Sequence, residues 1–151
     1  MSENKSIYVA NWLIKKIAES GDLVTNLKIQ KLLYYSEAWS QVINDKELID
    51  GEFQAWTHGP AVPEVYHKFK SSGSNPLPIP DEFIKLSPDE ENILNQVLDS
   101  YGQLPEKTLE NMIHSEDPWV HARDGYDPEE YCEKIIKKEE IKSYFKRKYK
   151  I

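Results

Sequence analysis

The sequence predicts an all-α fold: a compact single domain of six or seven helices with at most a minor extended element. The chain has 151 residues, which is the length of one ordinary domain. Its long segments repeat apolar residues at helical spacing, and no internal repeat or low-complexity run interrupts them. Every long segment therefore predicts a helix, and we expect one domain over residues 1–151.

Two long helices are expected near the N-terminus. The first covers residues 6–20, with Ile7, Leu13 and Ile17 on one face, and Gly21 ends it. The second covers residues 26–44. Its apolar face consists of Ile29, Leu32, Leu33, Trp39 and Ile43, broadened by Tyr34, Tyr35 and Ala38. Because this face is so broad, we expect the second helix to be packed on more than one side, as the central helix of the domain.

The middle of the chain is expected to be irregular. Phe53 and Ala55 alternate with other residues in a way that predicts a short extended piece. The Gly-Pro pair at residues 59–60 then forms a sharp turn that starts a short helix over residues 62–70. Residues 71–80 contain three prolines, which exclude a helix and predict an internal loop.

Four more helices are expected in the second half of the chain. Ser87, Pro88 and Glu90 form a helix-start signal, and the helix that they open ends at Gly102. The other three are expected at residues 105–114, directly after Asp117-Pro118, and at residues 138–149. Asp117 is expected to cap the short helix that follows it.

The charge is acidic overall but uneven along the chain. A net charge of −7 disfavours a general nucleic-acid or anionic-membrane binder. Residues 134–151 nevertheless carry eight Lys or Arg against two Glu, while the rest of the chain carries 11 basic against 24 acidic residues. This basic end is either a contact surface or a solvated helix face whose cations suit the C-terminal end of the helix dipole.

The sequence predicts neither export nor membrane insertion. No apolar run approaches the roughly 20 residues needed to span a bilayer, and the N-terminus lacks a signal-peptide pattern. Cys132 is the single cysteine, so no disulfide can form within the chain. We therefore expect a cytoplasmic protein.

The histidines do not form a strong catalytic or metal-binding pattern. Glu64 and His67 have the spacing of half a dimetal site, but the sequence has no second Glu-x-x-His. His114, Asp117 and His121 could gather into an acid–base or metal site, but capping already explains Asp117. Phosphate-binding and nucleophile motifs are also missing. We therefore expect no catalytic residues, no cofactor and no metal site.

Aromatic residues are the more informative signal. The chain has four Trp and nine Tyr, mostly at the ends of the expected elements. These two residue types dominate the hot spots of protein interfaces, although core packing also uses them. Trp56 stands in the irregular stretch beside His58, where either role would account for it. Aromatic residues on loops without a catalytic arrangement predict a binding module.

Four segments resemble, in order, the motifs of a known family. The run LKIQKLLYYSEAW at residues 27–39 resembles the leading motif of the Panacea domain, the SocA-like antitoxin family, also met as phage-associated proteins. Residues 53–66, FQAWTHGPAVPEVY, resemble its second motif. The DPW and AR of residues 117–123 resemble its third, and residues 136–145 resemble its closing segment. Together these matches cover almost the whole chain.

The resemblance implies a compact, mostly helical antitoxin. Such a protein binds a toxin encoded by the neighbouring gene and neutralises it by direct contact, in a chaperone-like manner. Two alternatives stay open: a proteolytic adaptor that delivers the toxin to a ClpXP-type AAA+ protease, and a DNA-binding regulator that uses the basic C-terminal helix. A small hydrolase or metal enzyme that uses the histidines is the alternative from another class. The expected partner is a cognate protein toxin, and the leading hypothesis includes neither nucleic acid nor a membrane.

Motif residues and contact residues are expected to be largely distinct. The motif residues form a fold signature that we expect to be structural: Leu32, Leu33, Tyr34, Trp39, Trp56, Gly59, Pro60, Pro118 and Trp119. We expect Trp56 and Trp119 to pack together and join the irregular segment to the late helix. The candidates for toxin contact are Trp56, His58, Tyr66 and the basic face of the last helix, Lys142, Lys146, Arg147 and Lys148.

Overall fold

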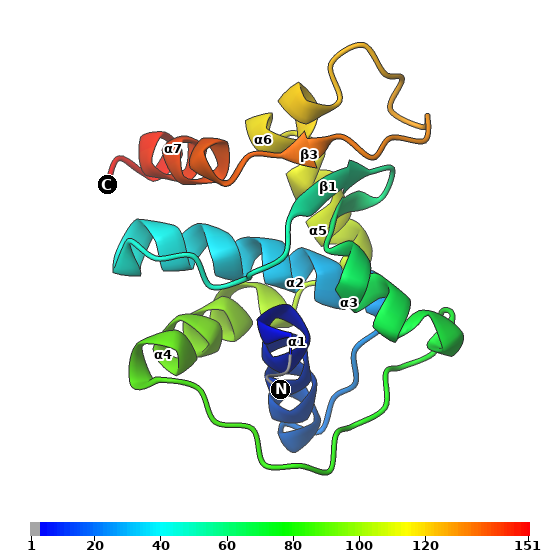
Figure 1. Ribbon diagram of the computed structural model, residues 1–151, viewed down its shortest axis with the longest axis vertical. Helices are drawn as coiled ribbons and strands as arrows, with labels where there is room; N and C mark the ends of the chain where they lie inside the picture. Colours follow the sequence, from blue (N-terminus) through cyan, green and yellow to red (C-terminus); the bar gives the residue numbers. More distant parts are fainter. Residues whose placement is uncertain (1–3) are drawn as a thin grey trace.

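Helix α2 (Asn26–Trp39) crosses the middle of the molecule, and the other elements pack around it (Figure 1). The computed structural model describes residues 4–151. Helices α1 and α4 lie on one side of α2, and α7 lies over its C-terminal part, while a small sheet lies near its N-terminal part (Figure 1). The other α-helices and β-strands are α1 (Lys5–Glu19), β1 (Phe53–Trp56), β2 (Gly59–Ala61), α3 (Pro63–Lys68), α4 (Pro88–Val97), α5 (Glu106–Ile113), α6 (Asp117–Ala122), β3 (Ile135–Ile136) and α7 (Lys138–Tyr149).

The two N-terminal helices form where the apolar pattern predicts them. The side chain of Asn4 caps α1, and that of Thr25 caps α2, each by accepting a hydrogen bond from a backbone N–H three residues on. Helix α2 contacts α1, α4, α5, α7 and β2, so its predicted central position is confirmed. Even Lys31 and Glu37 are buried on this helix.

The end of the second helix differs from the prediction. Residues 40–44 continue α2 as a π-helical turn, which ends at Asp45 with a left-handed φ of 56°. The wider turn rotates the side chains away from their α-helical phase. Ile43, which we expected on the apolar face, is 50% exposed as a result.

The extended element is a three-stranded antiparallel sheet in the order β2-β1-β3. Phe53 and Ala55 are buried and alternate with half-buried residues, as the sequence predicts. The expectation for residues 59–60 was wrong: they do not start a helix but belong to β2, and the chain reverses at residues 57–58. Gly59 has a φ of 133°, and the helix-starting proline is Pro63, after an N-cap at Val62.

The second half of the chain contains the expected helices, with one correction. The Ser87 side chain accepts from the Glu90 N–H while the Glu90 side chain accepts from the Ser87 N–H, so the predicted start of α4 is confirmed. Asp117, however, is not the cap of α6. Glu116 occupies the extended N-cap position, and Asp117 is the first residue of the helix.

The side chain of Glu116 lies in the core instead of capping α6. The hydroxyl groups of Tyr34 and Tyr35 donate to its two carboxylate oxygens at 3.0 and 2.9 Å. The Tyr35 ring in turn stacks on Tyr101 at 4.0 Å. Burial raises the pKa of Glu116, and the two phenol hydrogen bonds oppose that rise. These bonds attach the start of α6 to the centre of α2.

Core residues from α1 through α7 form one connected hydrophobic cluster. The expectation of one domain over residues 1–151 stays a prediction, and residues 1–3 lie outside the described part of the chain. None of the helices within residues 4–151 combines the length and the apolar character needed to cross a membrane.

Replacing Ser87 with alanine should destabilise the protein by about 1 kcal/mol, because α4 loses the hydrogen bond that caps its start. Urea unfolding followed by circular dichroism measures this change. Ser74→Ala, in an exposed loop position, is the matched control and should leave the midpoint unchanged. Equal midpoints for all three proteins would show that this cap does not stabilise α4.

Replacing Tyr35 with phenylalanine should destabilise the protein more at high pH than at low pH. The folded state holds the pKa of Glu116 above its usual 4.5, so stability decreases as pH rises and this carboxyl ionises. Without the Tyr35 hydroxyl, the ionised form loses a donor. We expect a loss of about 2 kcal/mol at pH 8 and about 1 kcal/mol once Glu116 is protonated.

Urea unfolding at steps from pH 4.5 to 8.5 tests the effect of Tyr35→Phe. Tyr131→Phe removes an exposed hydroxyl that bonds to Glu133 and is the control. A stability loss from Tyr35→Phe that does not change with pH would show that Glu116 does not depend on this phenol.

Candidate partner-binding site

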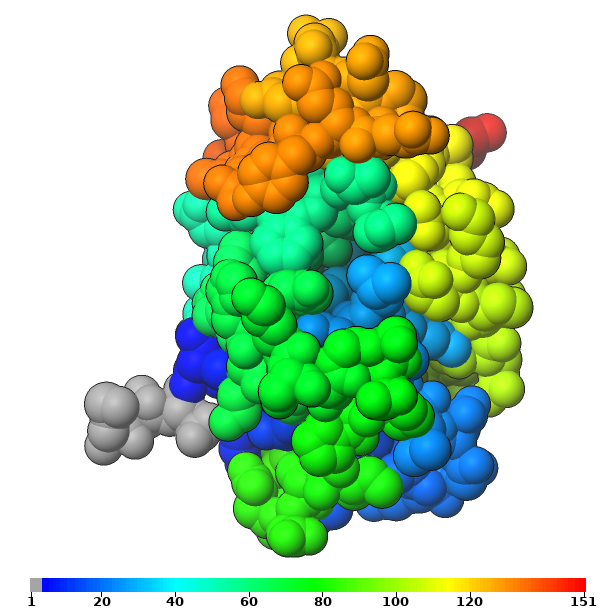
Figure 2. Space-filling model, turned by 90° about the vertical axis from the view of Figure 1, so that its right-hand side faces the viewer, coloured from blue at the N-terminus to red at the C-terminus, as the bar shows by residue number. Residues whose placement is uncertain are grey.

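A groove of about 300 Å³ lies between the N-terminal part of α2, the β1–β2 hairpin and α3. Figure 2 faces this side of the molecule, where the orange loop stands above the teal hairpin, with green α3 and the blue part of α2 close by. The groove is lined by Leu27, Gln30, Lys31, Trp56, Thr57, His58, Gly59, Pro60, Ala61, Tyr66 and Tyr131. Aromatic and apolar side chains form much of this surface.

The aromatic wall of the groove is held by the hairpin. The Trp56 indole N–H donates to Gln54 at 2.8 Å, and the Trp56 ring meets the Tyr66 ring edge-on at 4.9 Å. The indole N–H of Trp119 donates to the backbone carbonyl of Trp56 at 2.8 Å. The expected link between Trp56 and Trp119 is therefore a hydrogen bond to the backbone, while the Trp119 ring stacks on His114.

Arg123 connects two walls of the groove. Its side chain is buried, and one terminal nitrogen donates to the carbonyl of Ala55 in β1 at 2.8 Å. The other donates to the carbonyl of Asp127 at 2.8 Å and to that of Glu130. The guanidinium also lies over the ring of Trp119, 4.9 Å from its centre. The hairpin and the loop that carries Tyr131 are thus held by one side chain.

Polar side chains of α2 support the floor of the groove. Gln30 accepts from the N–H of Val62 at 2.8 Å, and Asn26 donates to the carbonyl of Tyr66 at 3.1 Å, which positions α3. Lys31 is buried and forms an ion pair with Glu106 at 2.9 Å. A side chain at position 59 would lie 3.4 Å from Lys31 and would need a positive φ, so glycine suits this position.

His58 stands at the tip of the hairpin. Its Nδ1 lies 3.5 Å from a carboxylate oxygen of Glu110, and 61% of its side chain is exposed. Burial alone would raise the pKa of Glu110, but His58 and the cations of Lys107 and Lys31 lower it below its usual value. These neighbours therefore favour the carboxylate form of Glu110.

Residues 4–151 contain no group of three or more His, Cys, Asp or Glu side chains placed to hold a metal ion. The carboxylate of Glu64 accepts a hydrogen bond from Asn4, and the ring of His67 packs edge-on against Tyr66. His121 lies 2.7 Å from Glu140 of α7. His114 is half-buried against Trp119, and burial lowers its pKa.

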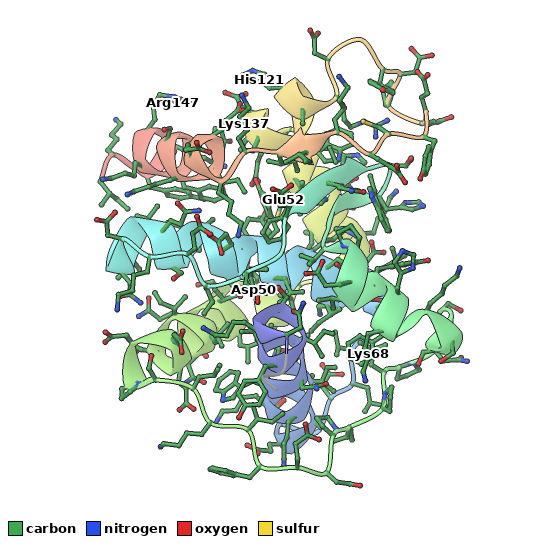
Figure 3. The ribbon with its side chains drawn as sticks, in the orientation of Figure 1. Asp50, Glu52, Lys68, His121, Lys137 and Arg147 are labelled. Carbon is green, nitrogen blue, oxygen red and sulfur yellow. The ribbon has the colours of Figure 1, made fainter. Side chains whose placement is uncertain are left out.

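The structure separates the predicted contact residues into two places. Trp56, His58 and Tyr66 meet in the groove, although 10 positions separate the first from the last. The basic residues lie on α7, and Figure 3 shows Arg147 there, far from Lys68 on α3. Lys142 pairs with Asp45, and Arg147 lies 3.4 Å from Asp117. Lys146 and Lys148 are exposed, the latter over the rings of Tyr144 and Tyr149.

Comparison with known proteins places the chain in a family. The profile of the family described as Antitoxin SocA-like, Panacea domain matches residues 29–120. The chain belongs to this family. Antitoxin SocA of Caulobacter vibrioides (strain NA1000 / CB15N) is similar to it, with 40% identity over 65 residues. These cover 43% of this chain and 35% of that relative, so the match spans about a third of the relative. No solved structure matches.

The Panacea match contains most of the groove. Gln30, Lys31, the hairpin and Tyr66 fall inside residues 29–120, whereas Leu27, Arg123, Tyr131 and α7 fall outside. Most of the motif residues are buried within the fold, and their structural role stays a prediction: Leu32, Leu33, Tyr34, Gly59, Pro60, Pro118 and Trp119. Trp39 is half-buried, and its indole donates to the Tyr101 hydroxyl at 3.0 Å.

Sequence reasoning did not single out six lining residues of the groove: Leu27, Gln30, Lys31, Thr57, Ala61 and Tyr131. Leu27 and Lys31 lie one helical turn apart and share a face of α2. The helical spacing in the sequence was therefore enough to predict that they lie together. Tyr131 comes from a turn-like segment, and the contacts that bring it to the groove depend on Arg123, eight residues earlier. The sequence offers no local signal for that connection.

Replacing Arg123 with lysine should destabilise the protein by about 2 kcal/mol or more. Lysine keeps the charge but lacks the planar fork that reaches carbonyls of both β1 and the loop. Hydrogen exchange should also become faster in residues 127–131. Arg147→Lys, which alters an exposed ion pair, is the control and should change stability by less than about 0.5 kcal/mol. Unchanged exchange in the loop would contradict this role of Arg123.

Proposed function

We propose that this protein is an antitoxin that neutralises a protein toxin encoded by the neighbouring gene. The observation that carries the proposal is the match of residues 29–120 to the Antitoxin SocA-like, Panacea domain family. The name of its C. vibrioides relative, Antitoxin SocA, supports it. The proposed action is direct, chaperone-like binding in the cytoplasm, where the toxin is made. It requires a stoichiometric complex and involves no catalytic turnover, cofactor or metal.

The groove is the contact that we propose for the toxin. Trp56 and Tyr66 offer partly exposed aromatic rings held by the fold, and the exposed His58 at the hairpin tip has its Nδ1 3.5 Å from Glu110. Pre-positioned aromatic side chains bury a large area while losing little conformational freedom, which is why they recur at interface hot spots. Tyr131 on the opposite wall is 71% exposed and adds a third aromatic ring.

Helix α7 is not part of the proposed contact. Two of its cations, Lys142 and Arg147, are paired with Asp45 and Asp117. Pairing reduces the positive charge that this face offers to a nucleic acid or to an acidic partner. Lys146 and Lys148 remain as exposed cations, and the experiment below includes them as a comparison.

Co-expression with the neighbouring gene tests the antitoxin function. Growth is scored when that gene is induced alone and together with this protein, and the purified material is analysed by size exclusion. We expect arrest in the first case, rescue in the second, and a stable complex. A neighbouring gene product that is harmless and does not co-purify would contradict the proposal. Rescue with loss of the toxin, reversed in a host lacking the ClpXP protease, would replace direct neutralisation with delivery for degradation.

Groove variants test where the toxin binds. Trp56→Ala and His58→Ala should each weaken the complex, and Trp56→Ala by about 30-fold, the effect of a hot spot of about 2 kcal/mol. Phe83→Ala removes an aromatic ring that is 80% exposed and lies outside the groove, and it should bind normally. Titration calorimetry gives the affinities, and urea unfolding confirms that each variant is folded. Loss of binding in Lys146→Ala or Lys148→Ala, with normal binding in the groove variants, would move the contact to α7.

A further inference from the structure

The loop above the groove is strongly acidic. Residues 124–133, named here the acidic loop, carry five carboxylates and no Lys or Arg: Asp124, Asp127, Glu129, Glu130 and Glu133. Tyr131 of this loop lines the groove, and its hydroxyl donates to Glu133. Thr57 at the hairpin tip donates to the backbone carbonyl of Glu130 at 3.4 Å. The negative charge therefore lies directly beside the aromatic wall.

Within the described part of the chain, residues 4–151, these carboxylates form no ion pair. The ion pairs formed among residues 4–151 use other acids, and none of them involves the acidic loop. The nearest buried cation, Arg123, is directed at backbone carbonyls of β1 and of this loop. On the floor of the groove, by contrast, Lys31 is paired with Glu106, and Lys107 is paired with Glu110. The acidic loop beside the groove therefore carries carboxylates without an ion-pair partner among residues 4–151.

The outer edge of the hairpin is strand β2, which is buried and poorly suited to adding a strand from a partner. The backbone groups of Ala55, which faces Pro60 across the sheet, are already paired. The Ala55 N–H donates to the backbone carbonyl of Lys134 at 2.8 Å, and the Ala55 carbonyl accepts from Arg123. Pro60 has no N–H to offer at the outer edge of β2, and the N–H of Val62 already donates to Gln30. A partner would therefore meet this site through its side chains.

We propose that the groove receives a positively charged segment of the toxin, with Arg or Lys side chains against the rings of Trp56, Tyr66 and Tyr131. A guanidinium or ammonium group is attracted to the faces of these rings. The unpaired carboxylates of the acidic loop add Coulomb attraction from the adjacent wall and speed the encounter. This inference rests on the proposed antitoxin function and specifies the chemistry of the same site.

A peptide titration tests this chemistry without the toxin. The 151-residue protein is titrated with penta-arginine, and the reporter is the NMR signal of the Trp56 indole N–H, assigned by its loss in Trp56→Phe. We expect this signal to shift with penta-arginine and not with penta-citrulline, which has a similar shape without the charge. Shifts confined to other parts of the surface, or equal shifts with both peptides, would overturn the proposal.

A charge-neutral variant of the acidic loop tests the same proposal with the toxin. Glu129→Gln, Glu130→Gln and Glu133→Gln, combined in one protein, should weaken toxin binding about tenfold and reduce its dependence on salt. The matched control, Asp81→Asn with Glu82→Gln and Asp99→Asn, removes the same number of exposed charges elsewhere and should bind normally. Equal affinities in both variants would overturn the cationic-segment proposal and leave the antitoxin function standing. Failure of the unaltered protein to bind the toxin at all would instead contradict the proposed function.

Discussion

The buried guanidinium of Arg123 is the constraint on which the candidate site depends. Removing a charged group from water is costly unless hydrogen bonds compensate it. Here the compensation comes from carbonyls of Ala55, Asp127 and Glu130, and from the ring of Trp119, rather than from a carboxylate. Because these carbonyls belong to β1 and to the acidic loop, the same bonds that satisfy Arg123 also bring the two walls of the groove together.

Helix α6 connects the groove to the centre of the molecule. Glu116, at the start of α6, accepts hydrogen bonds from Tyr34 and Tyr35 of α2. Trp119 and Arg123, one and two turns later, hold the hairpin. The groove is therefore built on elements joined to the core by buried polar contacts, and its aromatic faces are left available. Buried polar contacts beneath exposed aromatic faces suit a protein that binds through its surface and keeps its own fold unchanged.

Local signals were sufficient to predict much of the fold. The capping box at Ser87 located α4, helical spacing located α7, and the broad apolar face of residues 26–44 located the central helix. The three-residue strand β2 was missed because a Gly-Pro pair usually breaks regular structure. In this hairpin the pair belongs to the strand instead, with Gly59 at a φ of 133°. The capping prediction for Asp117 failed because Glu116 occupies the N-cap position, with its side chain buried against Tyr34 and Tyr35.

The candidate site was only partly predictable for a related reason. Trp56, His58 and Tyr66 stand close together in the sequence, and they also meet in the groove. The acidic loop, which carries Tyr131, is held beside the hairpin because Arg123 bonds both to Ala55 in β1 and to the loop. No pattern in the local sequence predicts these contacts. The basic residues of α7 were grouped with the others on charge alone, whereas in the fold they lie apart and two of them are paired with acids.

The central claim is that this Panacea domain binds a toxin through the groove. Hydrogen exchange of the protein alone and in complex with the product of the neighbouring gene tests it most directly. The account predicts slower exchange on binding at residues 56–61, around Tyr66 and in residues 127–133, with α1 and α7 unchanged. Protection confined to α7, or to α1 and the loop at residues 73–87, would contradict it.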